Sequence, residues 1–158
     1  MSGGPNILYA VSTGPIGVTS GIQTLWLLNP VTGPFIPVEL GISFNASVSS
    51  VPIRADLYIA ASVGSAAGNS ASVYPVGSTT VAATTTAMTA LGTEPSTKTL
   101  ISSWFIQPFG GVLDIQYPLG REGLSSIGGA TTNGRVGLQI NTPTGITCNV
   151  LSYVWFEE

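Results

Sequence analysis

The sequence predicts an all-β protein: a single antiparallel β-sandwich, jelly-roll-like, with about eight strands and at most one short helix. Apolar residues recur at every second position in several segments, which is the pattern of half-buried strands. The 158 residues include 20 glycines and 11 prolines, which break long helices. Turn residues separate the candidate strands at short intervals, as in sandwiches and barrels. We treat residues 1–158 as one domain and expect residues 1–6 to form a flexible or partner-binding arm.

Three strands are expected before residue 49. The first two are Ile7–Val11 and Gln23–Leu28, and the prolines and glycine within residues 29–34 end the second. The third has the strictest pattern, because apolar residues alternate with polar residues or glycine from Val38 to Val48. Such alternation indicates one buried and one solvated face.

The fourth expected strand, Ile53–Ile59, follows a break at residues 49–52. It also alternates, and it places Arg54 and Asp56 on the same face, two residues apart. We expect these two side chains to pair on the solvent face of the sheet.

The middle of the chain is harder to assign. Apart from Val63, residues 62–72 are glycine, alanine, serine and asparagine, and we expect an exposed loop there, with a strand candidate at Ser70–Val76. Residues 79–93 are rich in alanine and threonine, so a short helix is one alternative. Three consecutive threonines at 84–86 argue against it, because β-branched residues lose rotamer freedom in a helix. Both alternatives stay open.

Four strands are expected in the second half. Thr99–Gln107 and Val112–Tyr117 flank a tight connection at residues 108–111, which we interpret as a hairpin turn. A long loop then begins at residue 118. The last two strands are Arg135–Ile140 and Ile146–Phe156. Both faces of the last strand carry apolar residues, so we expect it to be central or covered on both sides.

Composition excludes several kinds of chemistry. The chain has no histidine and one cysteine, Cys148, so nucleophile–imidazole pairs, zinc sites of the His/Cys type and internal disulfides are excluded. We interpret Cys148 as a small buried apolar residue. No stretch of about 18 apolar residues occurs, so no membrane-spanning helix is expected. We expect no cofactor and no metal.

The chain is also poor in charge. Only 7% of its residues are charged, against about 25% in an ordinary domain. Nucleic-acid binding is not expected, because neutralising the phosphates requires many basic side chains. The chain has four: Arg54, Lys98, Arg121 and Arg135. So few charges protect a monomer weakly against self-association, which favours an oligomer or an array.

Three groups of residues are candidates for a site. Asp114 and Glu122 flank a glycine-rich stretch and form the one pair that a glycosidase could use, although we favour an outward-facing Asp114 without catalytic role. Arg121 and Glu122 lie in the most charged short segment, and we expect them at a subunit or shell interface. The aromatic residues, Trp155 among them, suit a core or interface better than a sugar platform. Trp155 therefore completes the predicted interface set.

A compact β pattern, a hydroxyl-rich surface and the absence of a catalytic set resemble virus or bacteriophage particle proteins of the head-decoration (cement) or jelly-roll capsid type. The features that carry this resemblance are the alternating strand from residue 38, the segment Pro118–Glu122 and the C-terminal segment Tyr153–Glu158. The resemblance implies a non-enzymatic virion protein that forms homo-oligomers, trimers for example, and packs against other capsid proteins. Two alternatives remain: a receptor- or carbohydrate-binding head, and a carboxylate-only glycosidase or lyase.

Overall fold

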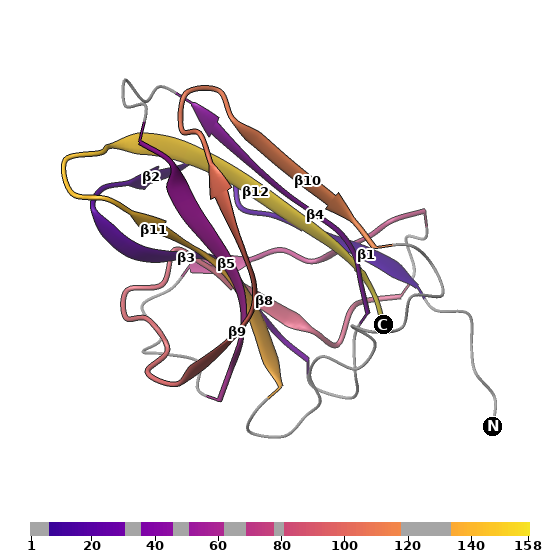
Figure 1. Ribbon diagram of the computed structural model, residues 1–158. Coiled ribbons are helices and arrows are strands. Elements are labelled where there is room, and N and C mark those ends of the chain that lie inside the picture. Colours follow the sequence, from indigo (N-terminus) through magenta and orange to yellow (C-terminus); the bar gives the residue numbers. More distant parts are fainter. Residues whose placement is uncertain (1–6, 31–35, 46–50, 62–68, 78–80, 118–133) are drawn as a thin grey trace.

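The computed structural model describes most of the chain and is shown in Figure 1. The described residues are 7–30, 36–45, 51–61, 69–77, 81–117 and 134–158. They contain twelve strands and no helix, and the strands form two antiparallel sheets packed against each other. The predicted all-β sandwich is therefore confirmed. The arm at residues 1–6 and the predicted interface residues Arg121 and Glu122 lie outside the described residues.

Each sheet has six strands. The first sheet has the order β10 (Val112–Gln116), β4 (Ile36–Asn45), β12 (Cys148–Glu157), β1 (Leu8–Ser12) and β7 (Tyr74–Pro75), and β2 (Ile16–Val18) also pairs with β12. The second sheet has the order β6 (Asn69–Ala71), β8 (Thr86–Thr89), β3 (Gly21–Asn29), β11 (Arg135–Thr142), β5 (Ile53–Ala60) and β9 (Lys98–Ile106).

The strand order is that of a jelly roll. We number the eight main strands in chain order from one to eight: β1, β3, β4, β5, β9, β10, β11 and β12. The first sheet then contains strands one, eight, three and six, and the second contains strands two, seven, four and five. This arrangement is the double-sheet jelly roll. The short strands β6, β7 and β8 are added between the fourth and fifth main strands.

The structure differs from the expected elements in the middle of the chain. The candidate strand 70–76 is two short strands that belong to different sheets, β6 and β7. The exposed loop expected over residues 62–72 therefore ends in a strand. The described part of the segment 79–93 contains β8 and no helix, since its threonines suit a strand. The strand β2 was not predicted.

The connection at residues 108–111 is not a hairpin. β9 and β10 belong to different sheets and do not pair with each other, so this turn carries the chain across the sandwich (Figure 1). Gly110 has a positive φ of 67°. A Cβ on Gly111 would lie 2.0 Å from the carbonyl oxygen of Gln107. The two glycines therefore make the crossing tight, and the sequence pattern of a tight turn does not distinguish a crossing from a hairpin.

The facing sides of the two sheets form the core. The alternation predicted for residues 38–48 is confirmed over residues 40–45, since Leu40, Ile42 and Phe44 are buried. It is wrong at Val38, because the register against β12 shifts there and Pro37 is buried instead. One polar bridge crosses this core. The indole Nε1 of Trp26 on β3 donates to Ser152 Oγ on β12 at 3.0 Å, and that hydroxyl donates to the carbonyl oxygen of Gly41 on β4 at 2.8 Å. Every polar atom of the bridge thus has a partner, as burial requires.

The segment that follows β8 covers part of the outer side of the second sheet. Glu94 accepts hydrogen bonds from the amide and the hydroxyl of Thr24, and from Lys98 Nζ at 2.8 Å. Leu91, in the same segment, packs on Tyr58. This cover buries polar side chains that alternate outward from the strands beneath it.

The predicted pair of Arg54 and Asp56 is present, but its expected place on the solvent face is wrong, because Asp56 is fully buried. Asp56 has further partners. Its carboxylate accepts from Ser103 Oγ at 2.6 Å and from Gln139 Nε2 at 3.1 Å. Arg54 Nε is 3.1 Å from the same carboxylate, and the arginine side chain extends to the solvent. A buried carboxylate is stable when charge and hydrogen bonds compensate its lost hydration, and here both do.

A glycine faces a tyrosine across neighbouring strands in each sheet. Gly137 on β11 pairs with Tyr58 on β5, and Gly41 on β4 pairs with Tyr153 on β12. A Cβ would lie 2.4 Å from Cζ of Tyr58 or 2.1 Å from Cε1 of Tyr153. Each ring therefore lies flat on its sheet because the opposite residue has no side chain.

We expect Gly137→Ala to destabilise the fold by about 1–3 kcal/mol, because the buried Tyr58 ring has no room to move. Gly41→Ala should cost less, since the Tyr153 ring is partly exposed and swings outward. Urea unfolding of both variants measures the difference. Equal losses would contradict this account of the two contacts.

Candidate functional site

The outer side of the first sheet is the candidate site. Its strands alternate strictly: on β12, Val150, Ser152, Val154 and Phe156 are buried, and Leu151 and Trp155 between them are exposed. In the part of the chain that the structure describes, no segment covers this side. We call it the open face and define it by Glu39, Gly41 and Ser43 on β4, Val112, Asp114 and Gln116 on β10, and Leu151, Tyr153 and Trp155 on β12.

The open face exposes large apolar side chains. Val112 is 71% exposed, Leu151 is 44% exposed and Trp155 is 37% exposed. The strand register places Val112, Ser43 and Leu151 in one row across β10, β4 and β12. Exposed apolar residues that lie together in this way mark surfaces that bind something.

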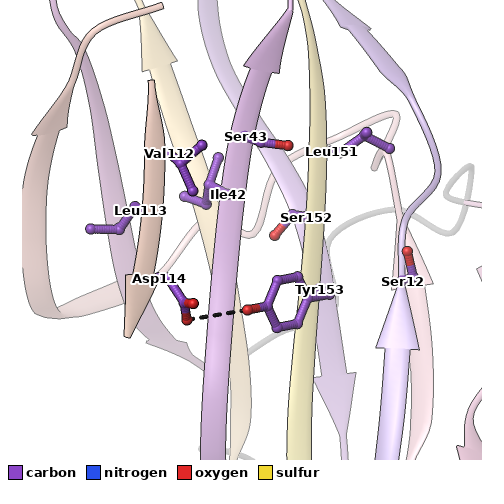
Figure 2. A pocket seen from close by; sticks show the side chains of 9 residues that line it. All are labelled: Ser12, Ile42, Ser43, Val112, Leu113, Asp114, Leu151, Ser152 and Tyr153. Carbon is purple, nitrogen blue, oxygen red and sulfur yellow. Dashed lines mark hydrogen bonds between the residues drawn. The ribbon is translucent and has the colours of Figure 1, made fainter. Parts of the chain in front are cut away.

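Tyr153 lies at the centre of the open face. Its ring lies over Gly41 on β4. Figure 2 shows its hydroxyl pointing toward the carboxylate of Asp114, and the carboxylate of Glu39 also lies within hydrogen-bond distance of it. The hydroxyl donates to Glu39 Oε1 at 2.6 Å, and Asp114 Oδ1 is 3.2 Å from the same oxygen. Gln116 Nε2 donates to the other oxygen of Glu39 at 3.2 Å. Burial and the two carboxylates raise the pKa of Tyr153, so the phenol keeps its proton.

Two hollows adjoin this group. One of about 370 Å³ is bordered by Val112 and Leu151 on its apolar side and by Ser12, Asp114 and Tyr153 on its polar side (Figure 2). The other, of about 540 Å³, is lined by Leu8, Val38, Glu39, Gln116, Tyr117 and Trp155. Both therefore combine apolar walls with hydrogen-bonding groups, which is the usual composition of a recognition surface.

The charge of this sheet has one sign. The strands of the first sheet carry Glu39, Asp114 and Glu157 and no lysine or arginine. The bases that the structure describes, Arg54, Lys98 and Arg135, all lie on strands of the second sheet. The open face therefore favours a partner that brings positive charge together with apolar surface.

The groups on this face can form hydrogen bonds and apolar contacts with a partner. The described residues contain no group of three or more histidine, cysteine, aspartate or glutamate side chains that could hold a metal ion. They also contain no helix that is long and apolar enough to cross a membrane. Two carboxylates joined through a phenol orient hydrogen-bond donors, and the apolar side chains beside them supply contact area.

The predicted site residues separate in the structure. Trp155 lies on the open face, and Asp114 points outward from β10, as expected. Arg121 and Glu122 lie outside the described residues, so neither the interface pair nor the Asp114–Glu122 alternative can be placed. The other two tryptophans belong to the core, Trp26 fully buried and Trp104 packed against it. Cys148 is buried, as predicted, and burial raises the pKa of its thiol.

Sequence reasoning missed Tyr153, Glu39 and Gly41. A signal for Tyr153 was present, since the outward positions of the last strand are Leu151, Tyr153 and Trp155. Their partners come from strands about 40 and 110 residues earlier in the chain, and periodicity does not encode strand order.

Comparison of the chain with protein-family models, with curated proteins and with solved structures finds no match. What the open face does must therefore be argued from its own geometry.

We expect the double variant Glu39→Gln/Asp114→Asn to lower the pKa of Tyr153 toward the ordinary value of about 10, because it removes two of the causes that raise it. Alkaline titration of phenolate absorbance measures this. The folded pKa of this phenol is raised, so its stabilising contribution is complete below about pH 10 and is lost as the pH rises through the folded pKa. Loss of stability at high pH should therefore be weaker in the variant.

Glu157→Gln removes an acid from the same strand as Tyr153 and serves as the control. A control that moved the titration as far as the double variant would contradict the assignment to Glu39 and Asp114.

Proposed function

We propose that this protein is a non-enzymatic structural subunit of a virus particle, a capsid decoration (cement) or shell protein that acts as a homo-oligomer. The observation that carries the proposal is the open face, an exposed sheet side with apolar residues and hollows in a chain of very low charge. The jelly-roll order is compatible with it, because viral capsid domains share that architecture. Lectin domains share it too, so the fold alone does not distinguish a capsid subunit from a lectin.

The proposed mechanism is adhesion by burial of apolar surface. Each Å² of apolar surface removed from water contributes about 25 cal/mol before the costs of association are subtracted. Val112, Leu151 and Trp155 supply such surface on one side of the molecule. The ions on the open face are Glu39 and Asp114, so a partner that buries this face must compensate these two carboxylates.

A carbohydrate- or receptor-binding module is the second candidate. One observation favours it: Trp155 lies beside Glu39 and Gln116 at the larger hollow. An aromatic ring can stack on a sugar. A carboxylate beside it can accept hydrogen bonds from the sugar hydroxyls, and an amide can both donate to them and accept from them. The two candidates make different demands on Trp155, since a sugar site needs the ring exposed and a packing site needs it covered.

We expect the purified chain to form a homo-oligomer at micromolar concentration, a trimer for example, and labelled antibody to place it on particles in electron micrographs. Light scattering and immunolabelling measure the two properties. A monomer that is absent from particles would overturn the proposal.

We also expect the protein to stay on its particle in about 0.5 M NaCl, because screening weakens contacts between ions and has little effect on apolar contacts. Sedimentation of salt-washed particles measures this. Release at that salt concentration, with the fold intact by circular dichroism, would contradict adhesion by apolar burial.

A glycan array separates the second candidate. Under the structural proposal the wild-type chain gives no specific signal, and Trp155→Ala lowers oligomer stability. A glycan signal that Trp155→Ala abolishes, with the oligomeric state unchanged, would favour the carbohydrate-binding module.

A further inference from the structure

The two sheets of the sandwich carry opposite charge. Strands of the first sheet carry acids alone, and the three described bases lie on the second sheet. All three bases are engaged within the chain. Lys98 Nζ donates to Glu94 at 2.8 Å and to Gln139 at 2.5 Å, and Arg135 Nη1 donates to the carbonyl oxygen of Ala61 at 3.0 Å. Arg54 pairs with Asp56 through Nε and still reaches the solvent, with a side chain 39% exposed against 14% for Lys98.

Arg54 is held in a defined orientation. Its Nε contacts the Asp56 carboxylate, and Ser103 and Gln139 fix that carboxylate in turn. One edge of the guanidinium is thereby anchored in the protein. A guanidinium anchored in this way loses little conformational entropy when it binds a second carboxylate.

Arg54 lies in a row across the second sheet that also holds two exposed apolar side chains. Phe105 on β9 pairs with Arg54, Asn141 pairs with Arg54 on the other side, and Ile22 on β3 pairs with Asn141. Phe105 is 75% exposed and Ile22 is also exposed. We call this row, Phe105–Arg54–Asn141–Ile22, the basic ridge.

We propose that the basic ridge of one copy binds the open face of the next copy. Phe105 would fill the hollow of about 370 Å³ between Val112 and Leu151, and Arg54 would face the carboxylate of Asp114. The ridge supplies a positive charge, which the open face lacks, and an exposed aromatic side chain of a size that the hollow can take. This inference deepens the proposed structural function and rests on it.

The simplest alternative is a symmetric contact between the open faces of two copies, and electrostatic repulsion disfavours it. That symmetric contact would place Glu39 and Asp114 of one copy near the same acids of its partner, and like charges at an interface oppose binding. The contact between ridge and open face is heterologous, so each copy has one of each surface. Such contacts generate a ring where the rotation closes and a filament where it does not.

The test uses two variants of the full chain that disable one surface each. Asp114→Arg reverses the charge of the open face, and Phe105→Asp replaces the apolar tip of the ridge by an acid. Both positions are exposed, so the fold should be preserved. Val81→Asp, at an exposed apolar position outside both surfaces, is the matched control. Light scattering and sedimentation velocity give the mass of each protein and of equimolar mixtures.

We expect the wild type and Val81→Asp to self-associate, and each of the other variants to lose about tenfold or more in association. A mixture of Asp114→Arg with Phe105→Asp should form a 1:1 heterodimer and nothing larger, because only one intact ridge and one intact open face can meet. If circular dichroism shows that a variant is unfolded, Val112→Lys replaces it for the open face and Ile22→Glu for the ridge.

The other outcomes overturn the inference in distinguishable ways. Self-association of Phe105→Asp alone, with Asp114→Arg monomeric, would indicate the symmetric contact of two open faces. Oligomers that survive both substitutions, or monomeric variants that fail to pair when mixed, would refute the ridge while leaving the structural function standing. A monomeric wild type would overturn the oligomer of the proposed function as well.

Discussion

The hydroxyl of Ser152 is the interaction on which both sides of the first sheet depend. It accepts from Trp26 on the opposite sheet and donates to the carbonyl of Gly41 on the neighbouring strand. The bridge thereby joins the two sheets and fixes the register of β12 against β4. In that register Gly41 lies opposite Tyr153. A shift of one residue would send Tyr153 into the core and Ser152 to the surface, so one buried polar group maintains the core and the open face together.

The positions of the strands along the chain were predictable because they depend on local alternation, and β4, β5, β11 and β12 occur where the pattern predicts them. The pairing of the strands into sheets was not predictable, because it joins segments that are far apart in sequence. The turn at residues 108–111 illustrates this. Its proline and glycines predict a tight connection correctly, but the same residues serve a hairpin within one sheet and a crossing between two. Only the partners of β9 and β10 distinguish the two cases.

For the candidate site, too, the outward residues were predictable and what lies over them was not. Because the outward positions of the last strand are apolar, we expected a strand that is central or covered on both sides. β12 is central, and within the described residues its outer side has no cover. The error about Asp56 has the opposite origin. Its alternation places it outward correctly, but the segment with Glu94, anchored to a threonine 70 residues away, covers part of that side. Periodicity reports the side of a sheet and does not report what lies over it.

The scarcity of charge gives each remaining charge more influence on how copies orient. In an ordinary domain many interspersed ions average to a weak field, and no single pair determines an orientation. Here the described acids and bases are few and lie mostly on opposite sheets, with Asp56 and Glu94 compensating bases on the second one. The fold thus leaves an uncompensated acidic side and an exposed arginine on the other. Apolar area supplies the affinity between such molecules, and the few charges determine which faces meet.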